Sequence, residues 1–390
     1  MTFPSPLAQE PHGAPASIVP PPAPAAPALP VPTRKGRSTP IWVFAVLIVL
    51  LIGLVAYLLT FLGAAASTIG MVLALLPLTG VLLAVRLVDR WEPEPRSLVI
   101  FAIAWGAIVS VGIALGVDIG LVALFGRDDS TFGEALSSVV QAPVVEEFAK
   151  GLGVFLIFAV ARRAFDGPVD GVVYGALVGA GFAFTENILY FATSLIDEGV
   201  DGTTITFFLR GILSPFAHVM FTAVTGYALG RAARSGRGAA AALGPGLLGL
   251  VGAIALHALW NGSAMFGDFF ELYVTLQVPL FIGFIVGVVL LRREESRLTR
   301  ERLGEYAAAG WFAPQEVDML ATSWGRRAGI AWARTLPGDR VRHMKDFIAD
   351  STALAAARQR ALTGRDPHAA EDEKVFLARA GAARVALLSR

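Results

Sequence analysis

Eight long apolar runs constrain this chain more than any other feature of its sequence. Each run is long enough to cross a hydrocarbon core of about 30 Å, which takes roughly 20 helical residues. The runs cover residues 41–61, 67–88, 98–125, 138–160, 169–192, 207–230, 247–265 and 272–291. Because 55% of the residues are hydrophobic and only 16% are charged, the sequence predicts an all-α, polytopic membrane helical bundle. It should contain about eight transmembrane helices in a lipid bilayer.

The charge of the segments that join these runs alternates along the chain. One set is basic and contains Arg34, Lys35, Arg37, Arg86, Arg90, Arg96, Arg162, Arg163, Arg231, Arg234, Arg237, Arg292 and Arg293. The other set is mainly acidic and contains Asp128, Asp129, Glu134, Asp197, Glu198, Asp201, Asp268 and Glu271, with Arg127 and Arg210 as its basic residues. Since positive charge collects on the cytoplasmic side, we expect a multi-pass protein of the cell membrane with both termini in the cytoplasm.

Composition divides the chain into three regions. Residues 1–40 are rich in Pro and Ala and predict a disordered cytoplasmic tail. Residues 41–292 form the membrane domain. Beyond it the sequence becomes charged and Ala-rich with a helical pattern, so we expect residues 293–390 to form a soluble, cytoplasmic, helical C-terminal region.

Two compositional facts exclude whole classes of function. The net charge is +1, and no basic stripe is interleaved with aromatic residues, so the sequence predicts no nucleic-acid partner. The chain has no cysteine, which excludes disulfides, thiolate nucleophiles and cysteine-ligated zinc. Any hydrolytic site must therefore be built from Glu, Asp, His, Ser or Lys.

Four successive runs carry ionisable residues where a membrane tolerates few. The run at 138–160 contains Glu146, Glu147 and Lys150, and the next three contain Glu186, His218 and His257. Buried charges cost several kcal/mol in a bilayer, so such residues point to function. At about 1.5 Å of rise per residue, these groups lie roughly 8 to 16 Å below the outer surface. We therefore expect one polar layer in the outer half of the membrane.

These residue types suit a hydrolytic metal site. Carboxylate and imidazole bind catalytic zinc through three protein ligands that leave a position for water. Glu186, His218 and His257 would supply the ligands for a divalent metal, expected to be Zn. Glu146 would then be the general base. Glu146 and Glu147 are both catalytic candidates, of which one would act directly and the other would pair with Lys150.

Two residues follow the histidines at i+4, on the same helical face. Thr222 follows His218 and Asn261 follows His257. Each could orient its imidazole or donate to a substrate. Asn261 or His218 is the candidate for stabilising an oxyanion.

Other interpretations of the same residues stay open. A lone membrane histidine is often an interhelical hydrogen-bonding residue, and an intramembrane Glu beside a Lys is often a neutralised pair. A transporter or proton-relay protein could use the same Glu and His residues, although a relay needs them spread from face to face. A catalytically inactive scaffold is a third possibility.

The order of these motifs resembles the PrsW family of intramembrane proteases and, more distantly, the CAAX-processing and Abi protease superfamily. The motifs are Glu146-Glu147-x-x-Lys150, Phe182-x-x-x-Glu186-Asn187, His218 and His257-x-x-x-Asn261. The likeness covers about residues 80–292. It implies that 41–292 is a transmembrane protease domain, usually classed as metal-dependent. The expected activity is cleavage of single-span proteins, such as membrane-anchored anti-sigma factors, near the extracytoplasmic face.

Overall fold

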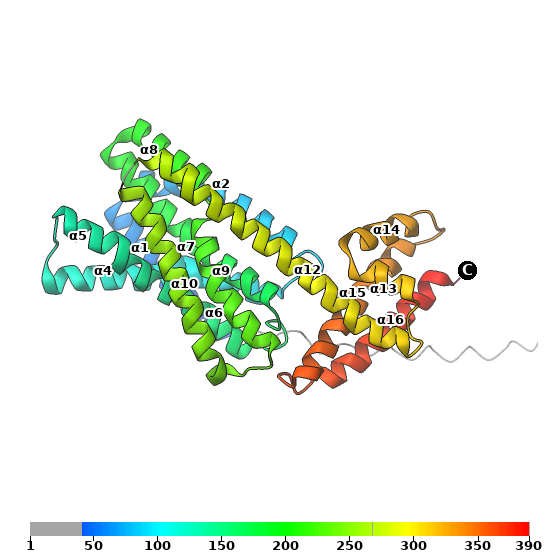
Figure 1. Cartoon of the computed structure of the whole chain (residues 1–390). Coiled ribbons are helices and arrows are strands. Elements are labelled where there is room, and N and C mark those ends of the chain that lie inside the picture. The colour runs from blue at the N-terminus through cyan, green and yellow to red at the C-terminus, as the bar shows by residue number, and fades with distance from the viewer. Residues whose placement is uncertain (1–40, 267, 390) are drawn as a thin grey trace, which may run out of the picture.

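The computed structural model describes residues 41–266 and 268–389, and the predicted tail at 1–40 lies outside them. The described residues form helices joined by short connections and contain no strand, so the predicted all-α class is confirmed. Figure 1 shows a bundle of long helices followed by a cluster of shorter helices at the C-terminal end.

Seven helical segments within the described residues are long and apolar enough to cross a membrane. They are Ile41–Phe61 (α1), Gly63–Val88 (α2), Arg96–Phe125, Pro168–Asp197 (α7), Gly199–Arg234, Ala239–Met265 (α10) and Phe269–Ala308. Each contains one of the predicted runs. The eighth predicted run, 138–160, is helical as well, but its three charged residues distinguish it from the other seven.

Three of these seven segments, and the helix of the eighth run, are composite helices that contain short π-helical stretches. They are built from α3 (Arg96–Ala104), η2 (Trp105–Ser110) and α4 (Val111–Phe125); α5 (Thr131–Leu136), η3 (Ser137–Gln141) and α6 (Ala142–Val160); α8 (Gly199–Phe207), η4 (Phe208–Leu213) and α9 (Ala217–Arg234); and α11 (Phe269–Leu272), η5 (Tyr273–Gln277) and α12 (Val278–Ala308). Such π-helical stretches occur frequently at functional sites. Two of them, η3 and η4, border the site described below.

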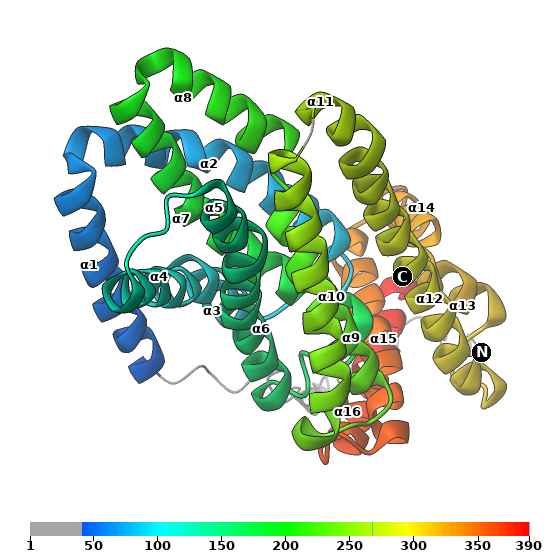
Figure 2. The ribbon, with the colours of Figure 1, turned by 60° about the vertical axis from the view of Figure 1, so that its left-hand side comes forward.

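Helix α7 is the centre of the bundle (Figure 2). In its apolar window 78% of the residues are buried, compared with at most 44% in the other six candidates among the described residues. Its glycines lie against the backbone of α9, because a Cβ on Gly171 would sit 2.0 Å from the carbonyl oxygen of Gly226. Small residues spaced four apart, as Gly171, Gly175 and Gly179 are, allow two helix backbones to approach this closely.

A tight loop joins α6 to α7 at the end of the bundle opposite the site. The Asp170 carboxylate accepts hydrogen bonds from the backbone N–H groups of Asp166 and Gly167, at 2.9 and 2.8 Å. Pro168 occupies the first turn of α7, where its missing N–H costs no helical hydrogen bond. Capping thus fixes the point at which α7 begins.

The C-terminal helices pack around the end of α12, which extends out of the bundle without a break (Figure 1). They are α13 (Pro314–Ala321), α14 (Ser323–Ala333), α15 (Arg340–Thr363) and α16 (Ala369–Leu388). Their own hydrophobic core includes Leu303, Phe347 and Leu354. The predicted boundary between 292 and 293 falls inside α12, and the division into domains stays a prediction.

Candidate functional site

Helix α6 buries three charged side chains that bind one another. The Lys150 ammonium lies 2.6 Å from Glu147 Oε1 and 3.3 Å from Glu146 Oε2. Glu147 and Lys150 are fully buried, and Glu146 is 9% exposed. The sequence suggested a pair with one carboxylate, whereas the structure has Lys150 shared between both.

Glu147 orients a histidine of another helix. Besides contacting Lys150, it accepts a hydrogen bond from Thr222 Oγ1 at 3.0 Å and lies 3.1 Å from His257 Nδ1. A carboxylate on one imidazole nitrogen fixes the ring and its tautomer. The other nitrogen, His257 Nε2, is therefore directed toward Glu146, whose Oε2 is 3.9 Å away.

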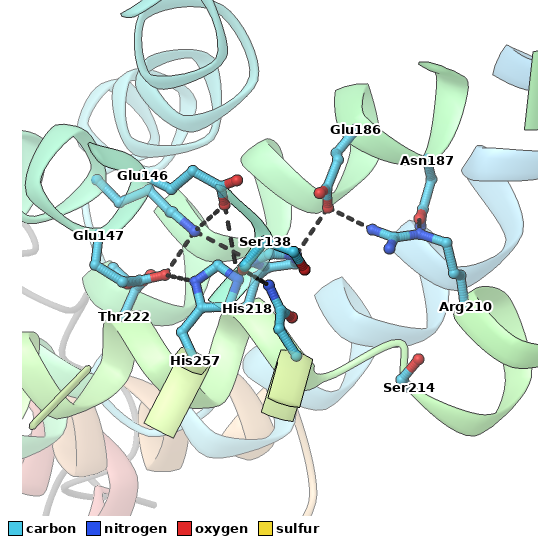
Figure 3. Close-up of polar contacts among 12 residues, drawn as sticks. Ser138, Glu146, Glu147, Glu186, Asn187, Arg210, Ser214, His218, Thr222 and His257 are labelled. Carbon is cyan, nitrogen blue, oxygen red and sulfur yellow. Dashed lines mark hydrogen bonds and ion pairs between the residues drawn. The ribbon is translucent and has the colours of Figure 1, made fainter. Parts of the chain in front are cut away.

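His218 lies between a cation and a carboxylate. Its Nδ1 is 3.1 Å from Lys150 Nζ, and its Nε2 is 2.8 Å from Glu186 Oε2. Because an ammonium group can only donate, Nδ1 accepts and Nε2 carries the proton that it donates to Glu186. The ring thus connects the α6 cluster to α7 (Figure 3).

Glu186 has a cationic partner that the sequence reasoning missed. The Arg210 guanidinium, on η4, donates to Glu186 and, through Nε, to Asn187 Oδ1 at 2.9 Å. It also lies 3.9 Å from the ring centroid of Tyr190. One signal was available, because Arg210 is one of only two basic residues in the predicted outer segments.

The i+4 partners do not contact the histidines as the sequence suggested. Thr222 donates to Glu147 instead of His218. The Asn261 amide donates to the backbone carbonyl of Ser138 on η3, at 2.9 Å, instead of contacting His257. Thr222 therefore helps to orient His257 through Glu147, and Asn261 joins α10 to η3.

Two cavities meet at this cluster. The larger, of about 410 Å³, is lined by Glu186, His218, His257, Asn261 and Arg210 among others. The smaller, of about 270 Å³, is lined by Glu146, Glu186, Asp118 and Gln141 among others. Glu186 and Tyr190 line both. A substrate in either cavity would thus lie beside a carboxylate of the cluster.

Three of the buried groups could hold a metal ion. One ligand atom each from Glu146, His218 and His257 lies within 4.8 Å of the other two, and all three residues are buried. Two imidazoles and a carboxylate form a donor set of catalytic zinc sites, so the residues fit a divalent metal once Lys150 no longer occupies the lone pair of His218 Nδ1. Glu186, which the sequence placed among the ligands, is outside this group but contacts His218.

The four predicted residues thus form one cluster. Glu146 comes from α6, Glu186 from α7, His218 from α9 and His257 from α10. Contacts that pass through Lys150, Glu147 and His218 connect all four. Asp118, an acidic residue of α4, also lines the smaller cavity.

Comparisons with known proteins point to one family. Residues 94–286 match the model of the PrsW family of intramembrane metalloproteases. "Protease PrsW" of Geobacillus kaustophilus (strain HTA426) is 31% identical over 144 residues, which is 37% of this chain and 58% of that protein. "Protease PrsW" of Oceanobacillus iheyensis is 34% identical over 139 residues, 36% of this chain and 58% of that protein. That of Bacillus subtilis (strain 168) is 28% identical over 144 residues, 37% of this chain and 60% of that protein.

These matches cover the helices that carry the site. The chain spans less than two thirds of the length of these relatives. No solved structure is significantly similar to it. The matched region nevertheless contains α6, α7, α9 and α10 whole, so the four helices that carry the site are similar to those of the PrsW family of intramembrane metalloproteases.

Proposed function

We propose that this protein is an intramembrane endopeptidase that hydrolyses a peptide bond of single-span membrane proteins near the extracytoplasmic face. Membrane-anchored anti-sigma factors are the expected kind of substrate. The observation that carries the proposal is the convergence of Glu146, His218 and His257, from three separate helices, on one buried point. The match to a metalloprotease family supports it.

We assign the metal ligands to His218, His257 and one glutamate. The geometry favours Glu146, which belongs to the converging group, whereas Glu186 is bound to Arg210. A divalent metal, with zinc as the expected ion, would polarise the scissile carbonyl and lower the pKa of water. Glu147 would act as a positioning residue, because it fixes the His257 ring through Nδ1.

The remaining carboxylate would move the proton. Glu186 lines both cavities and lies beside His218 Nε2, so it would accept a proton from the attacking water and return it to the leaving amine. The reverse assignment, with Glu186 as ligand and Glu146 as base, follows from the sequence alone. Both assignments use two histidines and two glutamates in different roles.

Asn261 is the proposed oxyanion donor. A primary amide carries two N–H groups, and the contact with the Ser138 carbonyl uses one. The same side chain lines the larger cavity. The second N–H would donate to the carbonyl oxygen as negative charge develops there, an effect commonly worth a factor of about 10²–10³ in rate.

Metal content and cleavage, measured on the same variants, test the proposal. Purified parent, Glu146→Gln and Glu186→Gln would be analysed for bound metal and incubated with a panel of single-span proteins, with Asp129→Asn as an exposed control. We expect both variants to lose cleavage but only Glu146→Gln to lose metal. Loss of metal in Glu186→Gln alone would reverse the two roles. A metal-loaded parent that cleaves no member of the panel would refute the peptidase assignment.

A further inference from the structure

The corner between α15 and α16 binds the end of α6 that lies opposite the site. Arg365, which is 7% exposed, donates to the carbonyl oxygen of Phe158 at 2.7 Å and to that of Phe165. Its guanidinium also stacks 4.3 Å from the Phe158 ring centroid. Phe158 is in the last turn of α6, where carbonyl groups lack helical partners and a cation is favourable. Arg365 therefore caps α6 from another part of the chain.

Ion pairs attach the same corner to the loop that joins α6 to α7. Arg360 Nη1 lies 2.6 Å from Asp166 Oδ2. In a second set of ion pairs the loop supplies the cation and the corner the carboxylates: Arg163 lies 3.3 Å from Asp366 and 3.6 Å from Asp372. Arg360, Asp366 and Asp372 are buried. Removal of one partner from a buried pair is strongly destabilising, so these contacts resist separation.

The corner also contacts the loop that joins α9 to α10. Gly236, in that loop, has a φ of +74° and packs so closely that a Cβ there would lie 2.6 Å from the carbonyl oxygen of Thr363. Helix α9 carries His218 and α10 carries His257. One structural element thus contacts both the loop between α6 and α7 and the loop between α9 and α10.

We propose that residues 360–372 form a clamp that positions the site helices, and that Arg365 is its principal positioning residue. The inference rests on the proposed peptidase function for its effect on rate. Phe158 is eleven residues from Glu147 on one continuous helix, about 16 Å at 1.5 Å per residue. A shift at the capped end is therefore transmitted to Glu146, Glu147 and Lys150. The clamp lies outside the region matched by the family, at residues 94–286.

Steady-state cleavage and hydrogen exchange on the full chain test the clamp. The variants are Arg365→Ala, Arg365→Lys and the control Arg342→Ala. The control removes an exposed arginine from α15, the helix that leads into the corner. We expect Arg365→Ala to lower kcat on the order of tenfold or more, because misplacement by about 1 Å can cost 10²-fold. KM should change little, since Arg365 lines neither cavity. Amide exchange should rise at residues 146–167, and Arg365→Lys should fall between Ala and the parent.

The outcomes separate this inference from the proposed function. Parental kcat in Arg365→Ala, or a reduced kcat without faster exchange at 146–167, would overturn the clamp. If Arg365→Ala does not fold, the test uses Arg365→Lys, which keeps the positive charge but lacks the forked guanidinium. Parental kcat and parental exchange in Arg365→Lys would then contradict a role for the guanidinium. An inactive parent would refute the peptidase proposal, while faster exchange at 146–150 in Arg365→Ala would still support the clamp.

Discussion

Substitution of Gly179 by Ala tests whether backbone contact between α7 and α9 places His218. A Cβ at position 179 would lie 2.4 Å from the His218 carbonyl oxygen, whereas ordinary contact begins at 3.4 Å. The two helices must therefore separate by about 1 Å, and such overpacking commonly costs about 1–3 kcal/mol of stability. His218 would move with α9, away from Glu186, its partner on α7 at 2.8 Å. Because a misplacement of about 1 Å can cost 10²-fold in rate, we expect cleavage to fall by about that factor.

The assay is cleavage of a single-span substrate, with unfolding of the purified variant measured in parallel. Gly80→Ala is the matched control, because it adds the same methyl group to a membrane helix where nothing lies within 4 Å. We expect the control to retain parental cleavage and stability. If Gly179→Ala also cleaves at the parental rate, the α7–α9 backbone contact does not determine the position of His218, and the packing argument is wrong.

Two further predictions follow from the site and from the charge pattern. Glu147→Gln should lower metal affinity by about 10- to 100-fold, because it removes the carboxylate that fixes His257 Nδ1; titration with zinc would measure this, and parental affinity would contradict the positioning role. Tags inserted at positions 130 and 200 should be accessible from outside intact cells and tags at 165 and 235 should not, since positive charge marks the cytoplasmic side; the opposite labelling would invert the proposed orientation.

Much of the membrane fold was predictable because its determinants are local. Run length and hydropathy locate helices that must satisfy their own backbone hydrogen bonds in lipid. Glycines spaced four apart on α7 are a local feature that permits a close helix contact, and the structure has α9 there. The conflict between charge and hydrophobicity at Glu146, Glu147 and Lys150 marked the helix where the site lies.

The side-chain contacts within the site were less predictable, because spacing along one helix does not say which other helix supplies a partner. Thr222 is at i+4 from His218, yet its hydroxyl binds Glu147 of α6. Arg210 comes from a π-helical stretch, where the phase of an α-helix cannot be extrapolated. Arg365 lies about 200 residues from the loop that it binds, and a lone arginine in a charged region carries no local signal of such a contact.

The balance of charge in the cluster gives a physical reason for preferring Glu146 as the metal ligand. Arg210 balances Glu186, and Lys150 is shared by Glu146 and Glu147. The three carboxylates therefore outnumber the two cationic side chains of the cluster by one. A buried, unbalanced charge is costly, so the cluster needs a proton or a bound cation. Glu147 has the shorter contact with Lys150 and two further partners, which leaves Glu146 as the carboxylate whose charge is least compensated. A divalent ion on Glu146, with neutral His218 and His257 as its other ligands, supplies that compensation at the point where the three residues converge.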